Sequence, residues 1–374
     1  MPVFAAEEEV HVHDTHENDE IIDELIVWGR ALTQKGTALS ASEGLVGYSD
    51  FSTRPLQRVG ELVEVVPGMV ATQHSGEGKA NQYFLRGMNL DHGTDFSAYF
   101  EGMPVNFRTH AHGQGYLDLN FLIPEVISTV RYAKGPYHAD RGDFSTAGTT
   151  SMSVYDRLDS PFFEIAAGSD AFGRLVAAGS VDVRDGHILS ALEIARNDGP
   201  WQNESDVQKT NFLIKYSGLW GEFETQTLLT YYDNKWNSTD QVPERLVSTG
   251  QLDRFGFIDP TLGGKSTRVN LIGGLELDNF RANAYVSRYK LNLFSNSTYF
   301  AEDPVNGDQR EQVDRRWVYG GYAEFTHDLS EIVSIKVGGD VRNDAIDDVN
   351  LYATTDRVRR EAIRKDSVDW LSLG

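Results

Sequence analysis

The sequence contains no cysteine among its 374 residues. A disulfide framework, a thiolate metal site and a cysteine nucleophile are therefore excluded. Basic residues are also scarce, because 34 Lys and Arg stand against 56 Asp and Glu and give a formal net charge of -22. A nucleic-acid partner is not expected, because phosphate binding needs a concentrated positive surface.

Long hydrophobic runs are missing as well. No stretch approaches the roughly 20 apolar residues that a membrane-spanning helix requires, and the mean hydropathy is -0.40. A helical membrane protein is therefore excluded, whereas a transmembrane β-barrel is not, because its strands show only alternating hydrophobicity. The 16 Tyr, 19 Phe, 6 Trp and 35 Gly suit a protein rich in strands and turns.

Residues 1–30 are predicted to be a flexible tail, because residues 7–24 are acidic and contain too little apolar material to form a core. Residues 1–6 resemble the end of a secretory signal, although an ordinary unstructured start is an equal alternative. A metal ion could bind in the tail, but a solvated tail is the favoured interpretation of its three alternating histidines, His11, His13 and His16.

Residues 31–158 have a mixed pattern that predicts a small α+β domain. Arg58 to Val66 places valine and leucine on one face of a short amphipathic helix, which Pro67 and Gly68 would end. Brief apolar strands are expected between polar loops, at residues 83–85, 98–100 and 129–132.

Residues 159–374 change to long strands in which apolar and polar side chains alternate. In residues 268–277, for example, valine and leucine alternate with positions that include Arg268 and Asn270. Nine such strands and the start of a tenth at Ser367 are predicted.

The connections between these strands alternate between short and long. Tight turns are predicted at residues 184–186, 218–221, 278–279 and 328–331, and long polar loops at 197–207, 234–265, 291–313 and 344–366. This layout is typical of an outer-membrane barrel, with its apolar strand faces toward lipid and its polar faces toward the lumen. The alternative is a chance regularity in a soluble sheet protein, which has no reason to sort its loops in this way.

Four motifs in the mixed segment occur in a recognisable order: ELVEVVPGM at 61–69, FLRGM at 84–88, FEGMPV at 100–105 and IPEVISTVRYAKGP at 123–136. In this order and spacing they resemble the plug domain of TonB-dependent outer-membrane receptors, and the resemblance covers nearly all of residues 31–158. Lys134 stands where the family usually has arginine, which keeps the charge but gives up the bidentate fork.

The resemblance implies an α+β plug at 31–158 followed by antiparallel strands of a transmembrane β-barrel at 159–374. The barrel would be incomplete, since nine and a half strands cannot close around this plug, and we expect a truncated gene or a fragment. The implied location is the outer membrane of a Gram-negative bacterium, in contact with its lipid.

The tail contains one strand-like segment that resembles the TonB box, the peptide that TonB captures: Glu24, Leu25, Ile26, Val27 and Trp28. TonB itself works with motor proteins of the inner membrane, so the resemblance implies energised transport of a scarce small-molecule ligand. That ligand could be a metal chelate, a siderophore, a vitamin or a glycan.

Two other functions are weighed against transport. A signal-transducing receptor would need an extra N-terminal domain, and the tail is too short and too polar to fold into one. A soluble β-rich binding protein would partition into buffer rather than detergent. An enzyme and a cofactor are not expected, because no nucleophile, base and orienting group occur together.

The resemblance also implies which residues meet the ligand, because in this family the plug loops corresponding to 70–80, 89–97 and 106–116 face the ligand chamber. The candidate ligand-binding residues in them are His74, Lys79, Asp91, His92, Asp95, Arg108, His110 and His112. Imidazoles could also bind a borderline metal, here through His92, His110 and His112. The favoured alternative is that these side chains cross-link the loops of a polar plug.

Overall fold

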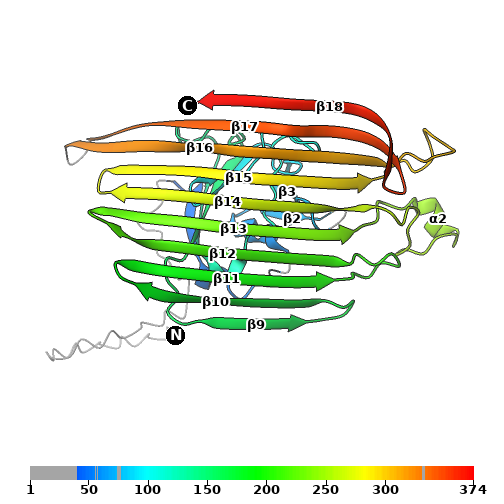
Figure 1. Ribbon diagram of the computed structural model, residues 1–374, viewed down its shortest axis with the longest axis horizontal. Helices are drawn as coiled ribbons and strands as arrows, with labels where there is room; N and C mark the ends of the chain where they lie inside the picture. Colours follow the sequence, from blue (N-terminus) through cyan, green and yellow to red (C-terminus); the bar gives the residue numbers. More distant parts are fainter. Residues whose placement is uncertain (1–39, 55, 57, 74–76, 331–332) are drawn as a thin grey trace, which may run out of the picture.

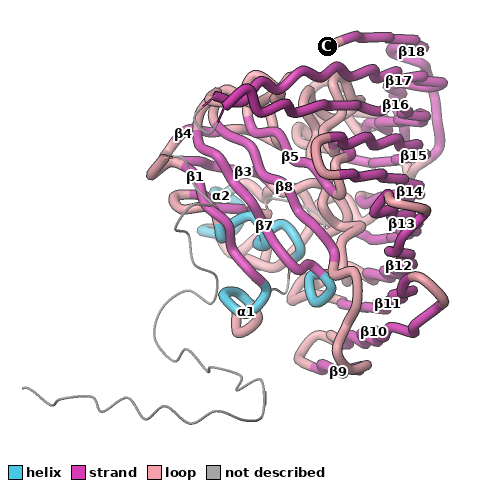
Figure 2. Tube along the Cα trace, turned by 90° about the vertical axis from the view of Figure 1, so that its left-hand side faces the viewer, coloured by secondary structure: helices cyan, strands magenta, loops and turns pink. Residues whose placement is uncertain are grey.

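The computed structural model describes residues 40–54, 56, 58–73, 77–330 and 333–374. A small α+β domain packs against one face of a broad sheet of long strands (Figure 2). The segment that resembles the TonB box, residues 24–28, and the candidate His74 lie outside the described residues.

Within the described part of the chain, no helix has the length and apolar character needed to cross a membrane.

The N-terminal domain is built on a mixed five-stranded sheet of order β1-β7-β8-β5-β6. Its neighbouring strands are antiparallel except for β5 and β8, which run parallel. The sheet consists of β1 (Glu43–Gly47), β5 (Phe96–Phe100), β6 (Met103–Pro104), β7 (Ile127–Lys134) and β8 (Gly148–Val154). A second sheet contains β2 (Met69–Thr72), β3 (Gln82–Leu85) and β4 (Met88–Asn89), and the short helices are α1 (Tyr48–Phe51), η1 (Val59–Val65) and η2 (Pro124–Val126).

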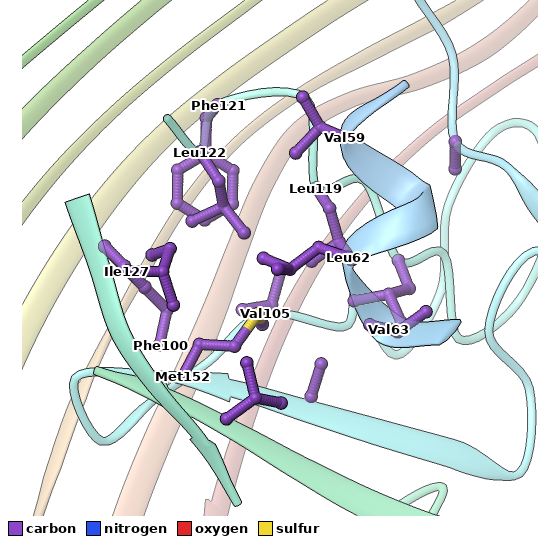
Figure 3. Packing of buried hydrophobic residues seen from close by; sticks show 14 of the residues in the cluster. Val59, Leu62, Val63, Phe100, Val105, Leu119, Phe121, Leu122, Ile127 and Met152 are labelled. Carbon is purple, nitrogen blue, oxygen red and sulfur yellow. The ribbon is translucent and has the colours of Figure 1, made fainter. Parts of the chain in front are cut away.

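The expected amphipathic helix is a single 3-10 helix, η1, whose apolar side chains enter the core of this domain. Val59, Leu62 and Val63 are buried and lie among residues from β5, β7 and the loops that follow β6 (Figure 3). Gly68 then takes a φ of +86°, which only glycine adopts readily, and the chain turns back into β2. The three expected strands of the segment lie within β3, β5 and β7.

The second part of the chain is a ten-stranded antiparallel sheet in which each strand pairs with the next along the sequence (Figure 1). Its strands are β9 (Phe162–Ala167), β10 (Gly173–Val183), β11 (Gly186–Asn197), β12 (Val207–Trp220), β13 (Phe223–Asn237), β14 (Gly263–Leu277), β15 (Phe280–Ser295), β16 (Arg310–Ser330), β17 (Val333–Thr355) and β18 (Val358–Leu373). The sheet is open, with β9 and β18 as its two edges. The predicted fold class, a small α+β plug followed by an incomplete antiparallel barrel, is confirmed.

The connections are sorted as the sequence predicts, with one exception. Two residues join β10 to β11, β12 to β13 and β14 to β15, whereas residues 198–206, 238–262 and 296–309 form long connections at the other end of the sheet. The helix α2 (Glu244–Ser248) lies in the second of these (Figure 1).

The predicted long loop at 344–366 is wrong, and so is the start of the tenth strand at Ser367. These residues continue β17 to Thr355 and begin β18 at Val358. The charged side chains of this segment pair across and along the strands, as Arg359 does with Glu311 on β16. A polar segment can therefore form strands, because the backbone hydrogen bonds of a hairpin do not require apolar side chains.

The two faces of the long sheet differ as the alternation predicts. On β14, Val269 and Leu271 are 37% and 45% exposed, while Arg268 and Asn270 between and beside them are at most 1% exposed. On β17, Val337 is 64% exposed, whereas Arg342 is buried. The apolar face points away from the plug and the polar face packs against it.

Candidate ligand site and plug–barrel interface

Two polar loops of the plug meet the barrel wall near the end that carries the long connections. Gly78 lies against Trp236 of β13, and Ala111 donates its main-chain N–H to Asp314 of β16 at 3.1 Å. A Cβ atom on residue 78 would lie 1.9 Å from a ring carbon of Trp236, so only glycine permits this approach. The close contact fixes the loop that carries Lys79 and Ala80.

Two of the candidate histidines meet at this junction. His92 Nδ1 lies 3.1 Å from the carbonyl oxygen of Ala80 and 3.0 Å from that of Asn81. His112 Nδ1 lies 2.7 Å from Oε1 of Gln312 on β16. The Nε2 atoms of the two rings are 3.2 Å apart. The plug loops and the barrel wall thus bring one nitrogen of each ring together and hold the other.

The third histidine, His110, is enclosed by aromatic rings. Its ring stacks on Tyr116 with centroids 3.9 Å apart and an interplanar angle of 12°, and Phe107 and Tyr289 lie on its other sides. His110 Nδ1 accepts the main-chain N–H of His112 at 3.1 Å, so Nε2 carries the proton. That nitrogen lies 3.8 Å from Asp314 Oδ2. The arrangement favours a packing role for His110, with its side chain shielded from a ligand.

Burial sets the electrostatics of the cluster, because it disfavours the charged form of every basic group in it. It lowers the pKa of His92, which the nearby Asp91 carboxylate partly restores. Burial also holds the pKa of His110 and His112 well below the usual value, and lowers the pKa of Lys79. The three imidazoles are therefore neutral near pH 7 and able to offer a lone pair.

The remaining predicted residues divide into two groups. Asp91 is exposed at the rim of the histidine cluster, with Oδ1 3.8 Å from His92 Nε2. Asp95 and Arg108 instead contact the loop that follows β7, Asp95 by accepting the hydroxyl of Thr146 and Arg108 by donating to Asp143. Within the described ranges, no three His, Asp or Glu side chains form a group that could hold a metal ion.

Several residues of this site come from the barrel and were not predicted from the sequence. Gln312 and Asp314 lie on β16, and Arg316 next to them donates to Asp314 from Nε at 2.7 Å. Arg316 and Arg268 also both lie over the ring of Phe107, at 4.7 and 5.0 Å from its centroid. The signal that could have found them is an acid and an arginine two residues apart in a strand, since both then face the lumen.

A second set of contacts ties the plug to the barrel wall away from the histidines. Arg174 of β10 donates to both carboxylate oxygens of Glu125 at 2.6 and 2.9 Å. Lys215 of β12 donates to Glu101 Oε1 at 3.0 Å, and Asn283 of β15 donates to the main-chain carbonyl of Glu101 at the same distance. These hydrogen bonds, of which those from Arg174 and Lys215 to the carboxylates are charge-assisted, join the two parts of the chain.

Comparison with known proteins agrees with this architecture. The family model described as the TonB-dependent receptor plug domain matches residues 36–149. The ferric citrate transporter FecA in its unliganded form has a TM-score of 0.65 and 16% identity, covering 88% of this chain and 51% of that one. The pyoverdine outer membrane receptor FpvA of Pseudomonas aeruginosa PAO1 has a TM-score of 0.65 and 12% identity, covering 89% and 53%. For the copper transporter OprC the values are 0.63, 14%, 88% and 49%.

The chain spans about half the length of these structures. The plug that matches the family model is joined to an open sheet with the fold of part of the receptors' barrel. Residues 36–149 thus match the plug domain of TonB-dependent receptors, and the chain as a whole has the fold of a receptor plug with part of a barrel.

Proposed function

We propose that the protein takes part in TonB-dependent active transport of a small ligand across the outer membrane. The observation that carries the proposal is the division of the long sheet into an apolar outer face and a polar inner face that holds a plug. An apolar face of this extent is stable only against lipid, which argues against a soluble binding protein. Exposed side chains on it include Leu271, Val337 and Trp317.

The plug explains why such transport needs energy. Ion pairs and hydrogen bonds such as Lys215 with Glu101 fasten it to the barrel wall, so a ligand at the outer loops cannot pass without a rearrangement. TonB and its inner-membrane motor proteins would supply the pull through residues 24–28, by adding this extended peptide to the edge of a TonB sheet.

The residues proposed to contact the ligand lie in the outer loops of the plug. Lys79, Asp91, His92 and His112 lie at one junction, where both charged and neutral donors are available. We propose that these residues contact the ligand, and that Asp95 and Arg108 are further candidates, as is His74 on the basis of the sequence alone. This set of groups suits a metal ion or a metal chelate.

The test is uptake by cells that carry the complete gene encoding this chain. Leu25→Pro removes a main-chain donor from the predicted TonB box, and Thr33→Pro outside the box is the matched control. We expect the first change to abolish uptake of zinc, copper or a ferric chelate while surface binding is retained, as in a strain without TonB. Uptake at the unaltered rate in the Leu25→Pro variant would contradict the proposal.

A further inference from the structure

A group of basic side chains lies on the outward face of the long sheet, which is apolar along most of its height. Lys290 of β15 is the register partner of Arg315 of β16, and the residues next to them, Tyr289 and Arg316, are fully buried on the inner face. Successive residues of a strand point to opposite faces, so Lys290 and Arg315 both point outward. Arg288, two residues before Lys290, points the same way. Three cations from two neighbouring strands therefore form one basic patch.

Acidic side chains neutralise two of these three cations. Arg288 donates to Asp347 Oδ2 at 2.6 Å, and Arg315 donates to Asp348 Oδ2 at 3.2 Å. Lys290 is exposed and has no acidic partner in the part of the chain that the structure describes. Like charges directly opposite each other on neighbouring strands destabilise a sheet. Lys290 therefore adds an uncompensated positive charge opposite Arg315, which an anion from outside the chain would balance.

The height of the patch places it at the edge of the lipid. The outward residues of β15 from Phe280 to Val286 are apolar, and Lys290 lies ten residues beyond Phe280. At about 3.4 Å per residue and a tilt of about 40°, ten residues span a height of about 26 Å. The apolar band of an outer-membrane barrel is about 25 Å tall, so Lys290 reaches the level of the headgroups. The long connections follow at this end of the sheet, which is the outer side in such barrels.

A row of aromatic side chains marks the same boundary. Across the sheet register, Tyr231 pairs with Val269, Val269 with Arg288, and Arg288 with Trp317. Tyr231 and Trp317 are 42% and 45% exposed on the outward face, and the Arg288 guanidinium lies over the Trp317 ring, 5.0 Å from its centroid. Tryptophan and tyrosine collect at the interface between membrane and water. Lys290 lies one outward residue beyond this row, within reach of lipid phosphate groups.

We propose that Arg288, Lys290 and Arg315 bind the phosphate group of a lipid in the outer leaflet. The phosphate supplies the anion that Lys290 lacks, and the two guanidinium groups offer paired N–H donors that phosphate accepts. The acyl chains of the same lipid would lie along the apolar face below, over Val286 and its register partner Leu271. The inference rests on the outer-membrane location that the proposed function requires, and it adds a lipid partner with a defined place on the sheet.

The same face carries one more charged pair close to the patch. Lys265 of β14 lies 3.0 Å from Asp233 of β13, and the two charges cancel. The patch and this pair together keep the excess positive charge of Lys290, in a chain whose formal net charge is -22. The local charge therefore favours an anionic headgroup where the charge of the whole chain would not.

The experiment uses protein purified in non-ionic detergent from cells that carry the complete gene encoding this chain, after removal of bound lipid. Affinities are measured for diphosphorylated lipid A, for dephosphorylated lipid A and for inorganic phosphate. The test variants are Lys290→Gln and Lys290→Glu. Lys336→Gln is the matched control, because Lys336 of β17 lies near the opposite end of the sheet and pairs with Glu324.

We expect the starting protein and the control to bind the diphosphorylated lipid at least tenfold more tightly than the dephosphorylated one. Lys290→Gln should weaken binding about fivefold, the contribution of one basic residue beside anionic headgroups, and Lys290→Glu about 25-fold. Without lipid, neither variant should melt at a lower temperature, because each removes a like charge opposite Arg315. A lysine that only supports the fold would instead lower the melting temperature on substitution.

Equal affinity of the starting protein for the two lipids would overturn the inference, and this comparison needs no variant. Unchanged affinity in Lys290→Glu would overturn it as well. Inorganic phosphate that binds as tightly as the lipid would show a site for a free ion in place of a lipid. A protein that ignores the lipid phosphate but supports uptake sensitive to Leu25→Pro would refute the lipid site and leave the transport function standing. Lipid binding with uptake that is insensitive to Leu25→Pro would contradict only the transport function.

Discussion

The ion pair between Lys215 and Glu101 offers the sharpest test of how the plug is held. The two side chains are only 3% and 6% exposed, and Nζ lies 3.0 Å from Oε1. Glu101 Oε1 also accepts the main-chain N–H of Val154 at 2.6 Å, while Lys215 donates to the carbonyl of Val154 and contacts Asp156 at 2.9 Å. The lysine therefore has three partners, and the carboxylate depends mainly on one charge.

This asymmetry predicts unequal costs for the two single substitutions. Lys215→Met leaves a buried carboxylate with one N–H donor, and removing one partner of such a pair costs about 3–5 kcal/mol. Glu101→Gln keeps an acceptor for Val154, and Lys215 keeps Asp156, so we expect a cost of about 1–2 kcal/mol. The double variant buries no unpaired charge and should be less destabilised than Lys215→Met alone.

Hydrogen exchange followed by mass spectrometry measures the local loss of stability in β8 and at the end of β5. If the free energy of opening falls by about 3–5 kcal/mol, exchange there becomes about 10²- to 10⁴-fold faster, because about 1.4 kcal/mol corresponds to each factor of ten. Strands β9 and β10, away from the pair, serve as internal controls. Equal effects of the two single substitutions, or a Lys215→Met effect below about 1 kcal/mol, would show that this ion pair does not hold the plug.

Three further outcomes are expected. Gly78→Ala should weaken the seating of the plug by about 1–3 kcal/mol, seen as a lower melting temperature, because its Cβ would lie 1.9 Å from Trp236; an unchanged melting temperature would argue against this contact. Leu271→Arg on the outward face should cost about 2–4 kcal/mol and reduce assembly into membranes, measured by heat-modifiable mobility in gels. Burial raises the pKa of Asp118, so ionisation costs more in the folded state. Asp118→Asn should therefore stabilise the protein near pH 7 in urea unfolding, and the gain should vanish as the pH falls toward 4.

The class of fold was predictable because it is encoded in short-range patterns. The alternation in residues 268–277 states which side chains share a face, whatever the strand packs against. The turns near 185, 221 and 278 are likewise local, since two-residue connections depend on a few neighbouring residues. The error at 344–366 has the same origin, because local polarity does not distinguish a loop from a strand whose side chains are mostly polar.

The candidate site was only partly visible in the sequence. Three histidines in two plug loops could be named, but nothing in their spacing states that His92 and His112 meet while His110 is enclosed by aromatic rings. Lys79 was named as a ligand contact, and its burial beside the cluster was not foreseen.

Most of the strands, their two faces, the order of the plug motifs and the residue types available to a ligand can be predicted from the sequence alone. Which of these residues meet depends on the tertiary fold, because Gln312 and Asp314 reach the plug across about 200 residues of chain. Such contacts depend on the register of ten paired strands and on how the plug is seated against them. Local patterns carry no information on either, since both are set by packing between parts of the chain that are distant in sequence.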